Sequence, residues 1–444
     1  MEKIIDRFLR YVAIDTQSDD KATCQPSTGK QLNLLRLLNE ELRAMGVESH
    51  LDHNGYVMAS IPSNSAKDCP AIGFIAHVDT SPDASGTNIR PQIIENYDGS
   101  DIPLSPEDRS EDRSEDKSED KSEDRSKDRS KDRSEDRSED RKDSEQTGLV
   151  LKTEDFPELL NYIGQTIITT DGTTLLGADD KAGVAEIMQA AQYIMEHPEF
   201  EHGDIKIAFT PDEEVGRGTE HFDVKAFGAR YAYTMDGGAI GELEYENFNA
   251  AEATVHIQGR NIHPGYAKGK MKNALLIGME FNDLLPADQR PECTSGYEGF
   301  YHITDFNGTV EETQIHYIIR DHDSASYEAK IDFIKECASL INQKYGENTV
   351  SITIHHQYSN MKKEVEPHLH IIEKAKKAMV MEGITPIVQP IRGGTDGANL
   401  SYMGIPCPNI FAGGHNFHGK LEFVPLESME KAYKVILNLV SLFL

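Results

Sequence analysis

Short apolar segments alternate with amphipathic helical segments along much of the chain, and this alternation limits the folds that the chain can adopt. Residues 71–76, 205–210 and 231–235 are apolar runs with the length of buried strands. Residues 182–196 repeat their apolar side chains at helical spacing. Strands that alternate with helices predict a mostly parallel sheet with helices on both faces. The predicted fold class is therefore α/β.

The pattern changes between residues 248 and 358, where polar and apolar residues alternate with period two. This alternation is typical of antiparallel strands with one buried face, and it occurs at 253–257, 313–319 and 350–355. Helix-like stretches lie between these segments, at 271–284 and 326–345.

These two textures predict a divided chain. We expect a first domain built from residues 1–247 and 359–444. An inserted α+β domain at 248–358 separates its two parts. With 444 residues, the chain is long enough for two domains that each have a core.

A charged tetrad repeat occupies residues 107–141 and contains no apolar residue. Such a segment cannot bury a core, so we expect it to be disordered. Arg-Ser and Arg-Asp repeats occur in RNA-associated proteins, which is one interpretation. The alternative is a repeat expansion tolerated in a surface loop. We favour the loop because 11 basic and 16 acidic residues give no phosphate-seeking field.

The overall charge of −31 argues against nucleic acid or an anionic membrane as a partner. The five cysteines are dispersed and form no CxxC motif, which is typical of reduced thiols. The N-terminus lacks the apolar region of a signal peptide. The apolar tail at 435–444 is too short to span a bilayer. We therefore expect a soluble cytoplasmic enzyme.

Polar residues follow the predicted strands at the points where the strands end. His77-Val-Asp79 comes directly after the run 71–76. Period two puts His77 and Asp79 on the same side, so His77 could bind a metal ion while Asp79 holds its other ring nitrogen. Taken alone, this tripeptide is better explained as a polar strand end.

Further strand ends carry the same kinds of side chain. An Asp179-Asp180 pair lies between a predicted strand at 174–176 and the helix at 182–196, where it could also cap that helix. Ligand sites in open α/β sheets gather at the carboxyl ends of strands, and five such ends are harder to explain as caps. Together they suit two zinc ions that share a bridging aspartate, about 3.5–4 Å apart. The remaining strand ends contribute Glu213-Glu214, Asp236 and the stretch 411–422, which contains His415 and His418.

The chain resembles the peptidase T family of tripeptide aminopeptidases. That family belongs to the larger di-zinc family that also contains carboxypeptidase G and succinyl-diaminopimelate desuccinylase. The resemblance covers nearly the whole chain except the repeat, and a chain without 107–141 has the family's usual length. It implies that residues 1–247 and 359–444 form the catalytic domain and that 248–358 form a lid or dimerisation domain. The matching stretches are 77–83, 96–99, 164–166, 169–183, 211–218, 236–238, 263–271, 320–323, 392–397 and 416–420.

The resemblance implies two zinc ions per subunit, each with two ligands of its own and one ligand that both ions share. One ion is bound by His77 and Asp236, the other by Glu214 and His418, and Asp179 bridges them. His415 is a rival for His418, which we prefer because the stretch 418–422 keeps the family's His-x-x-x-Glu spacing. The family also has a cis peptide bond between Asp179 and Asp180.

The resemblance also implies a mechanism. Glu213 is the general base, and Asp79 orients His77. A hydroxide held between the zinc ions attacks the scissile carbonyl after Glu213 has taken its proton, and Glu213 then returns a proton to the leaving amine. His263 is the family's oxyanion donor, supplied by the same chain or by a dimer partner. A plain turn histidine is the alternative.

The substrate-binding residues are less distinctive. Arg392 precedes two glycines and could clamp a terminal carboxylate, with Arg320 as a helper. Each arginine could equally form a surface ion pair. The chain also departs from close relatives, which often have histidine where Leu421 stands and tyrosine where His415 stands. These departures leave the substrate preference open.

Three functions compete. The first is a tripeptide aminopeptidase that acts on short peptides, with a homodimer formed through the inserted domain. The second is a dipeptidase or an N-acyl-amino-acid hydrolase of the same di-zinc family. A requirement for a free α-amino group separates the first two functions, and the sequence does not show one. The third is a non-enzymatic or RNA-associated protein that uses the 107–141 repeat. The complete set of ligands and base counts against the third.

Overall fold

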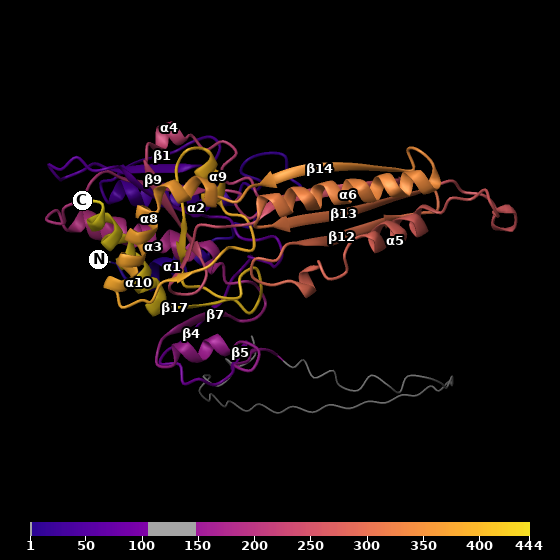
Figure 1. The fold of residues 1–444 in the computed structure, drawn as a ribbon. Helices are drawn as coiled ribbons and strands as arrows, with labels where there is room; N and C mark the ends of the chain where they lie inside the picture. Colours follow the sequence, from indigo (N-terminus) through magenta and orange to yellow (C-terminus); the bar gives the residue numbers. More distant parts are fainter. Residues whose placement is uncertain (1, 105–147) are drawn as a thin grey trace, which may run out of the picture.

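A computed structural model describes residues 2–104 and 148–444. The predicted disordered repeat at 107–141 lies outside the described residues. The described strands form a large eight-stranded sheet, a separate four-stranded sheet and two smaller sheets. The four-stranded sheet projects away from the rest of the chain, and both termini lie on the opposite side (Figure 1). We call residues 249–358 the inserted region and the remainder the main region.

The large sheet confirms the predicted α/β class and is parallel at its centre. Strands β8, β3, β9 and β16 run parallel to one another. On one side β2 and β1 continue with antiparallel pairs; on the other side β10 pairs antiparallel with β16, and β15 pairs parallel with β10. β3 is buried along its whole length, as its uninterrupted apolar run predicts. In sheet order the strands are β1 (Glu48–Leu51), β2 (Val57–Ile61), β8 (Ile205–Thr210), β3 (Ile72–His77), β9 (Tyr231–Gly237), β16 (Asn409–Phe411), β10 (Glu242–Glu244) and β15 (Ile387–Val388).

Helices cover both faces of this sheet, and the strands send alternate side chains to each face. On β3, Phe74 joins the larger core while Ile75 joins a core on the other face. The larger core lies under α1 (Ile4–Val12), α2 (Gln31–Ala44), α3 (Ala178–Glu196), α8 (His370–Met381) and α10 (Leu426–Leu442). The other face carries α4 (Val224–Phe227) and α9 (Asp396–Tyr402), and short helices α7 (Lys362–Val365) and η4 (Glu366–His368) precede α8.

A small subdomain with its own core packs beside the large sheet. It contains the sheet β17 (Phe423–Pro425), β7 (Ile167–Thr170) and β4 (Pro91–Ile94), the pair β5 (Ile102–Leu104) and β6 (Leu149–Leu151), and the helix η1 (Pro157–Tyr162). The sequence predicted a strand immediately before Asp179, and this prediction is wrong. β7 ends at Thr170, and residues 171–177 follow as an irregular loop.

The inserted region has one buried face and one open face. On β13, Ile315, Tyr317 and Ile319 are buried against the helices, and the residues between them are more exposed. Helices α5 and α6 lie on the buried face (Figure 1). β12 was not predicted, because exposed residues occupy most of its length. The elements are β11 (Asn249–Gln258), η2 (Pro264–Tyr266), α5 (Ala274–Leu284), η3 (Pro291–Cys293), β12 (Phe300–Gly308), β13 (Glu312–Asp321), α6 (Ser324–Tyr345) and β14 (Val350–Tyr358).

Buried asparagines hold the two strands of the chain together where it crosses between the regions. The Asn247 side chain accepts a hydrogen bond from the N–H of Met361 at 2.7 Å. The Asn249 side chain accepts one from the N–H of Asn360 at 3.0 Å. These crossings lie beside the expected boundaries at 247/248 and 358/359, which stay predictions. No helix in the described residues is long and apolar enough to cross a membrane.

Candidate metal centre

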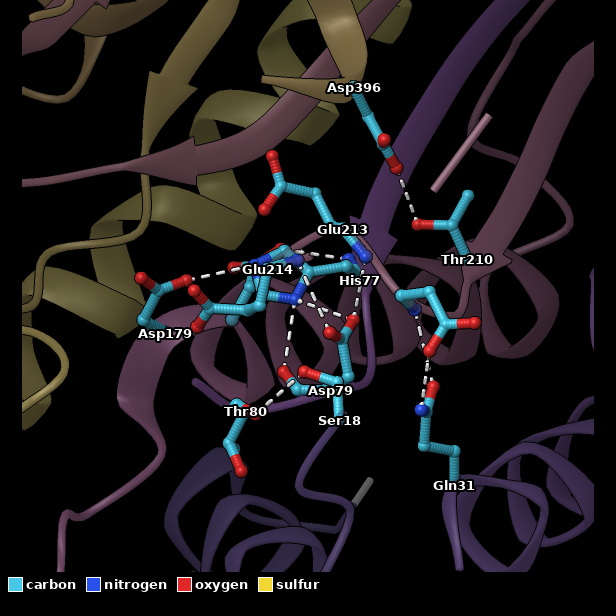
Figure 2. A network of polar contacts seen from close by, with 12 residues as sticks. Ser18, Gln31, His77, Asp79, Thr80, Asp179, Thr210, Glu213, Glu214 and Asp396 are labelled. Atoms are coloured by element: carbon cyan, nitrogen blue, oxygen red, sulfur yellow. Dashed lines mark hydrogen bonds and ion pairs between the residues drawn. The ribbon is translucent and has the colours of Figure 1, made fainter. Parts of the chain in front are cut away.

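Ionisable side chains from distant parts of the sequence meet at the carboxyl ends of β3, β8 and β9 (Figure 2). His77 ends β3, Glu213 and Glu214 follow β8, and Asp236 lies near the end of β9. Asp179 is in the first turn of α3, and the loop between β16 and β17 supplies His418. Parallel strands that end at one edge bring such residues together, as the sequence predicted.

Asp179 belongs to two groups of possible metal ligands in the described residues. His77, Asp179 and Asp236 form one group, and Asp179, Glu214 and His418 form the other; within each, the ligand atoms lie within 4.8 Å of one another. Asp179 Oδ1 is 2.9 Å from His77 Nε2, and its Oδ2 is 3.2 Å from His418 Nε2. The two oxygens of one carboxylate therefore face different histidines, as a bridging ligand requires.

The remaining ligand contacts are similarly short. His77 Nε2 is 3.4 Å from Asp236 Oδ1, and His418 Nε2 is 2.9 Å from Glu214 Oε2. The other oxygen of Glu214 is buried and has no hydrogen-bond partner among the described residues. An unpartnered buried carboxylate oxygen is costly unless a cation binds it.

Asp79 contacts both the histidine and the glutamates. Its backbone carbonyl lies 3.0 Å from His77 Nδ1, closer than its carboxylate oxygen Oδ1 at 3.4 Å. Its carboxylate accepts the backbone N–H groups of Glu213 at 3.0 Å and Glu214 at 3.2 Å. Asp79 therefore sets the position of the Glu213-Glu214 turn as well as contacting the His77 ring.

The concentration of buried carboxylates raises several pKa values. Burial, reinforced by repulsion from Asp179, raises the pKa of Glu214 to about 8. Burial and repulsion from Asp236 raise the pKa of Glu213 well above its ordinary value. Hydrogen bonds to Asp179 and Glu214 raise the pKa of His418 to about 11. The two groups together offer imidazole nitrogens and carboxylate oxygens, which fit Zn²⁺.

The adjacent glutamates point in different directions. Glu214 points toward Asp179, whereas the Glu213 carboxylate extends away from both Asp179 and Asp79 (Figure 2). Glu213 lies outside both ligand groups. It borders a pocket of about 610 Å³, whose other lining residues include Glu214, Arg320, Tyr358, Asp396 and His418.

Local backbone geometry supports the cluster. The peptide bond between Asp179 and Asp180 is cis, as the resemblance implied. Asp180 is fully buried, and its carboxylate accepts the N–H of His77 at 3.2 Å. Gly183 is the required residue one turn later, because a Cβ there would lie 2.0 Å from the carbonyl oxygen of Met235. The start of α3 therefore packs directly on the end of β9.

A family model described as peptidase family M20/M25/M40 matches residues 170–442. The chain belongs to this family. The peptidase T of Caldanaerobacter subterraneus subsp. tengcongensis is 52% identical over 444 residues, which cover 100% of this chain and 99% of that protein. The resemblance to the peptidase T family is thereby confirmed.

Solved structures of M20 relatives share the fold. The aminopeptidase PepT from Bacillus cereus superposes with a TM-score of 0.72 at 21% identity, covering 99% of this chain and 98% of that one. A Bacillus subtilis protein described as a dinuclear metal-binding peptidase of the M20 family superposes with a TM-score of 0.59 at 13% identity, covering 99% and 97%. These likenesses establish a common architecture for the M20 chain described here.

The two candidate substrate-binding arginines occupy different positions. Arg320 borders the pocket, donates to the carbonyl groups of Ala251 and Ile319, and lies over the Tyr358 ring. Arg392 is exposed, and its guanidinium donates to a loop of the inserted region at Thr294, Gly296 and Glu298. In this structure Arg392 therefore connects the main region to the inserted region.

The other two histidines lie outside the ligand groups. His263 is exposed in the loop 259–273, at the end of the inserted region that is remote from the main region (Figure 1). His415 stacks on Phe423, lies 2.7 Å from the Tyr162 hydroxyl, and has a pKa lowered to about 4 by burial. His418, the preferred candidate from sequence, is the histidine that lies next to Asp179.

Buried carboxylates around the cluster were missed as site residues. Asp396 lines the pocket, accepts a hydrogen bond from Thr210 at 2.7 Å, and has a pKa raised to about 7 by burial. Glu422 is 1% exposed and accepts backbone N–H groups beside Asp179. Both residues lie in stretches named in the sequence analysis for the family resemblance, 392–397 and 418–422. The positions of Asp396 and Glu422 in the sequence did not indicate these contacts.

Proposed function

We propose that this M20 chain is a zinc-dependent aminopeptidase that releases the N-terminal residue from tripeptides. Identity of 52% to a peptidase T over the full length of both chains supports this substrate class. The observation that carries the proposal is the pair of ligand groups that share Asp179. Two cations held side by side are a recurring device of hydrolytic sites.

The residues divide into two zinc sites with a common member. His77 and Asp236 would hold one ion, Glu214 and His418 the other, and Asp179 would give one oxygen to each. Zinc ions bound here would lower the pKa of a water molecule and polarise the scissile carbonyl group. The raised pKa of Glu214 and its unpartnered oxygen support this assignment.

Glu213 is the proposed general base. It borders the pocket and lies outside both ligand groups, so its carboxylate is free to exchange a proton. It takes the proton of the attacking water and returns a proton to the leaving amine. The N–H bonds to Asp79 fix the turn from which both Glu213 and Glu214 project, so the base and its neighbouring ligand keep a constant separation.

Arg320 is the proposed contact for the carboxylate of the peptide. It lies in the pocket wall with its guanidinium over Tyr358, and a carboxylate clamp at a fixed distance from the metal ions would favour peptides of one length. We expect Arg320→Ala to weaken hydrolysis of a tripeptide more than that of its C-terminal amide. Arg392→Ala should slow both substrates equally, because its partners are in the loop 294–298.

His263 is the proposed oxyanion donor, delivered by a second copy of the chain in a homodimer. Its loop stands away from the metal centre of its own chain (Figure 1). Mixing inactive Glu213→Gln and His263→Ala proteins in equal amounts should restore about a quarter of wild-type activity, because half of the dimers are then mixed and each mixed dimer contains one complete site out of two. A mixture that stays inactive would contradict delivery from the partner.

The decisive experiment compares a tripeptide, its N-acetylated form and a dipeptide as substrates. We expect hydrolysis of the tripeptide only, with loss of activity in chelator and recovery on adding Zn²⁺. Glu213→Gln should lower kcat by about 10²–10⁴-fold while the zinc content stays the same. Rapid hydrolysis of the N-acetylated peptide would favour the N-acyl-amino-acid hydrolase, and full activity of Glu213→Gln would refute the proposed base.

A further inference from the structure

A buried carboxylate that is not a candidate ligand holds the segment that leads into Asp179. Glu422 Oε2 accepts the N–H of Leu176 at 2.7 Å and that of Gly177 at 2.8 Å. Its Oε1 accepts the N–H of Asp179 at 3.1 Å. Three backbone donors therefore converge on one side chain that is 1% exposed.

The loop before α3 needs such an acceptor. Residues 171–177 are irregular, and Leu176 is fully buried, so its N–H has neither a strand partner nor solvent. Gly177 has φ +77°, and a Cβ there would lie 3.2 Å from the side chain of Thr80. The loop can enter the protein interior before Asp179 because Glu422 accepts hydrogen bonds from the buried N–H groups that the loop leaves without backbone partners.

Glu422 is itself fixed from the other side. Its backbone carbonyl accepts a hydrogen bond from the Thr169 hydroxyl at 2.8 Å. The next residue, Phe423, begins β17 and pairs with Thr169 of β7. Glu422 also lies four residues after His418, so one short segment carries a candidate ligand and the residue that holds the bridging ligand. A movement of the loop 171–177 would therefore also move the stretch 418–422, and the reverse.

The neighbouring ligands are held in the same way. Asp79 accepts the N–H groups of Glu213 and Glu214, and Asp180 accepts that of His77. Glu422 performs this task for Asp179, which is the residue common to both ligand groups. Removal of the Glu422 carboxylate should therefore affect the binding of both metal ions, since Asp179 would give one oxygen to each.

We propose that Glu422 is a positioning residue that fixes Asp179 between two zinc ions and so sets the affinity for both. This proposal rests on the two-zinc site proposed above. Outer groups that orient metal ligands typically contribute about 10–100-fold to metal affinity. We expect an effect of that size on both zinc dissociation constants when Glu422 loses its charge.

The test titrates metal-free protein with Zn²⁺ against a chromophoric chelator. Glu422→Gln keeps the size of the side chain, but its NH₂ group must face a backbone donor, because both oxygens of Glu422 accept N–H groups. Glu427→Gln is the matched control. Glu427 also accepts a backbone N–H with both oxygens, from Thr166 at 3.1 and 2.9 Å, and it lies in the first turn of α10.

We expect Glu422→Gln to weaken both zinc affinities about 10–100-fold, whereas Glu427→Gln leaves them unchanged at a similar loss of thermal stability. Glu422→Asp, which keeps the charge, should lie between wild type and Glu422→Gln, and it replaces the glutamine variant if that protein does not fold. Wild-type zinc affinities in these variants would overturn the proposal, as would failure of both to fold. Wild-type protein that binds fewer than two zinc ions would instead refute the two-zinc site.

Discussion

The large sheet and the inserted sheet differ in how deeply they bury their ionisable side chains. Around the ends of β3 and β8, Asp79 and Asp180 are completely buried, and burial raises the pKa of Asp180 well above its ordinary value. On the inserted sheet, charged side chains such as Glu312 lie on the open face, and the buried Asp321 is paired with Lys330. There the side chains of the ion pair His256 and Glu312 are 40% and 63% exposed.

This difference separates stability from function. The inserted region follows the simple rule of an apolar face against helices and a polar face in water, so its side chains stabilise it without unpaired buried charge. The edge of the large sheet breaks that rule with several carboxylates in one place. Burying like charges together is unfavourable unless cations bind them. We therefore expect the candidate metal centre to lower the stability of the metal-free protein, and bound cations would restore it.

The largest expected effect comes from the residue common to both ligand groups. Asp179→Asn should abolish tight binding of both zinc ions. Activity should fall by roughly 10³-fold or more, which corresponds to a loss of about 4 kcal/mol of transition-state stabilisation. The control is Asp321→Asn in the inserted region, where Asp321 is also a buried aspartate and pairs with Lys330. This variant should still bind both ions. Metal analysis and tripeptide hydrolysis measure the two outcomes.

The opposite behaviour is expected in the inserted core. Phe281 of α5 is fully buried there, and Phe281→Ala should lower the free energy of unfolding by about 3–5 kcal/mol. Zinc affinity should stay unchanged, because the large sheet holds the ligands. A denaturant titration with a parallel zinc titration checks both parts. Loss of zinc binding in the folded variant would break the comparison, since it would make the centre depend on the inserted core.

Replacing the Glu213 carboxyl group with an amide should stabilise the metal-free protein at high pH. Because burial raises the pKa of Glu213, its folded form resists ionisation, and the wild type loses stability as pH rises above the unfolded value of about 4.3. Metal-free Glu213→Gln lacks this loss and should be more stable at pH 8, by about 1–3 kcal/mol. Thermal unfolding from pH 5 to 8 measures the difference. Curves that stay parallel would show that the pKa of Glu213 is not raised in the folded protein.

The smallest expected effect has the opposite pH dependence. Burial lowers the pKa of His415 to about 4, so the unfolded chain takes up a proton first as the pH falls from about 6.5. The wild type should therefore lose stability between pH 6.5 and 4 relative to His415→Phe, which costs about 1 kcal/mol at neutral pH through the Tyr162 contact. A constant difference across this range would contradict the assignment.

The sequence predicted the convergence of the ligand residues better than the way they are held. His77, Glu214 and Asp236 follow regular strands, so topology alone brought them to one edge. Asp179 follows an irregular loop, and the strand predicted before it does not form. That loop is held by Glu422, which is distant in sequence, and no local pattern reveals such a contact. For the same reason the hydrogen bonds from Arg392 to the loop 294–298 could not be predicted.

The central claim is that Asp179 lies between two metal ions, one for each ligand group. Anomalous diffraction from crystals of the zinc-loaded protein tests this directly. We expect two zinc peaks about 3.5–4 Å apart, one beside His77 and Asp236 and one beside Glu214 and His418, with an oxygen of Asp179 on each. A single peak, or two peaks of which only one contacts Asp179, would contradict the account.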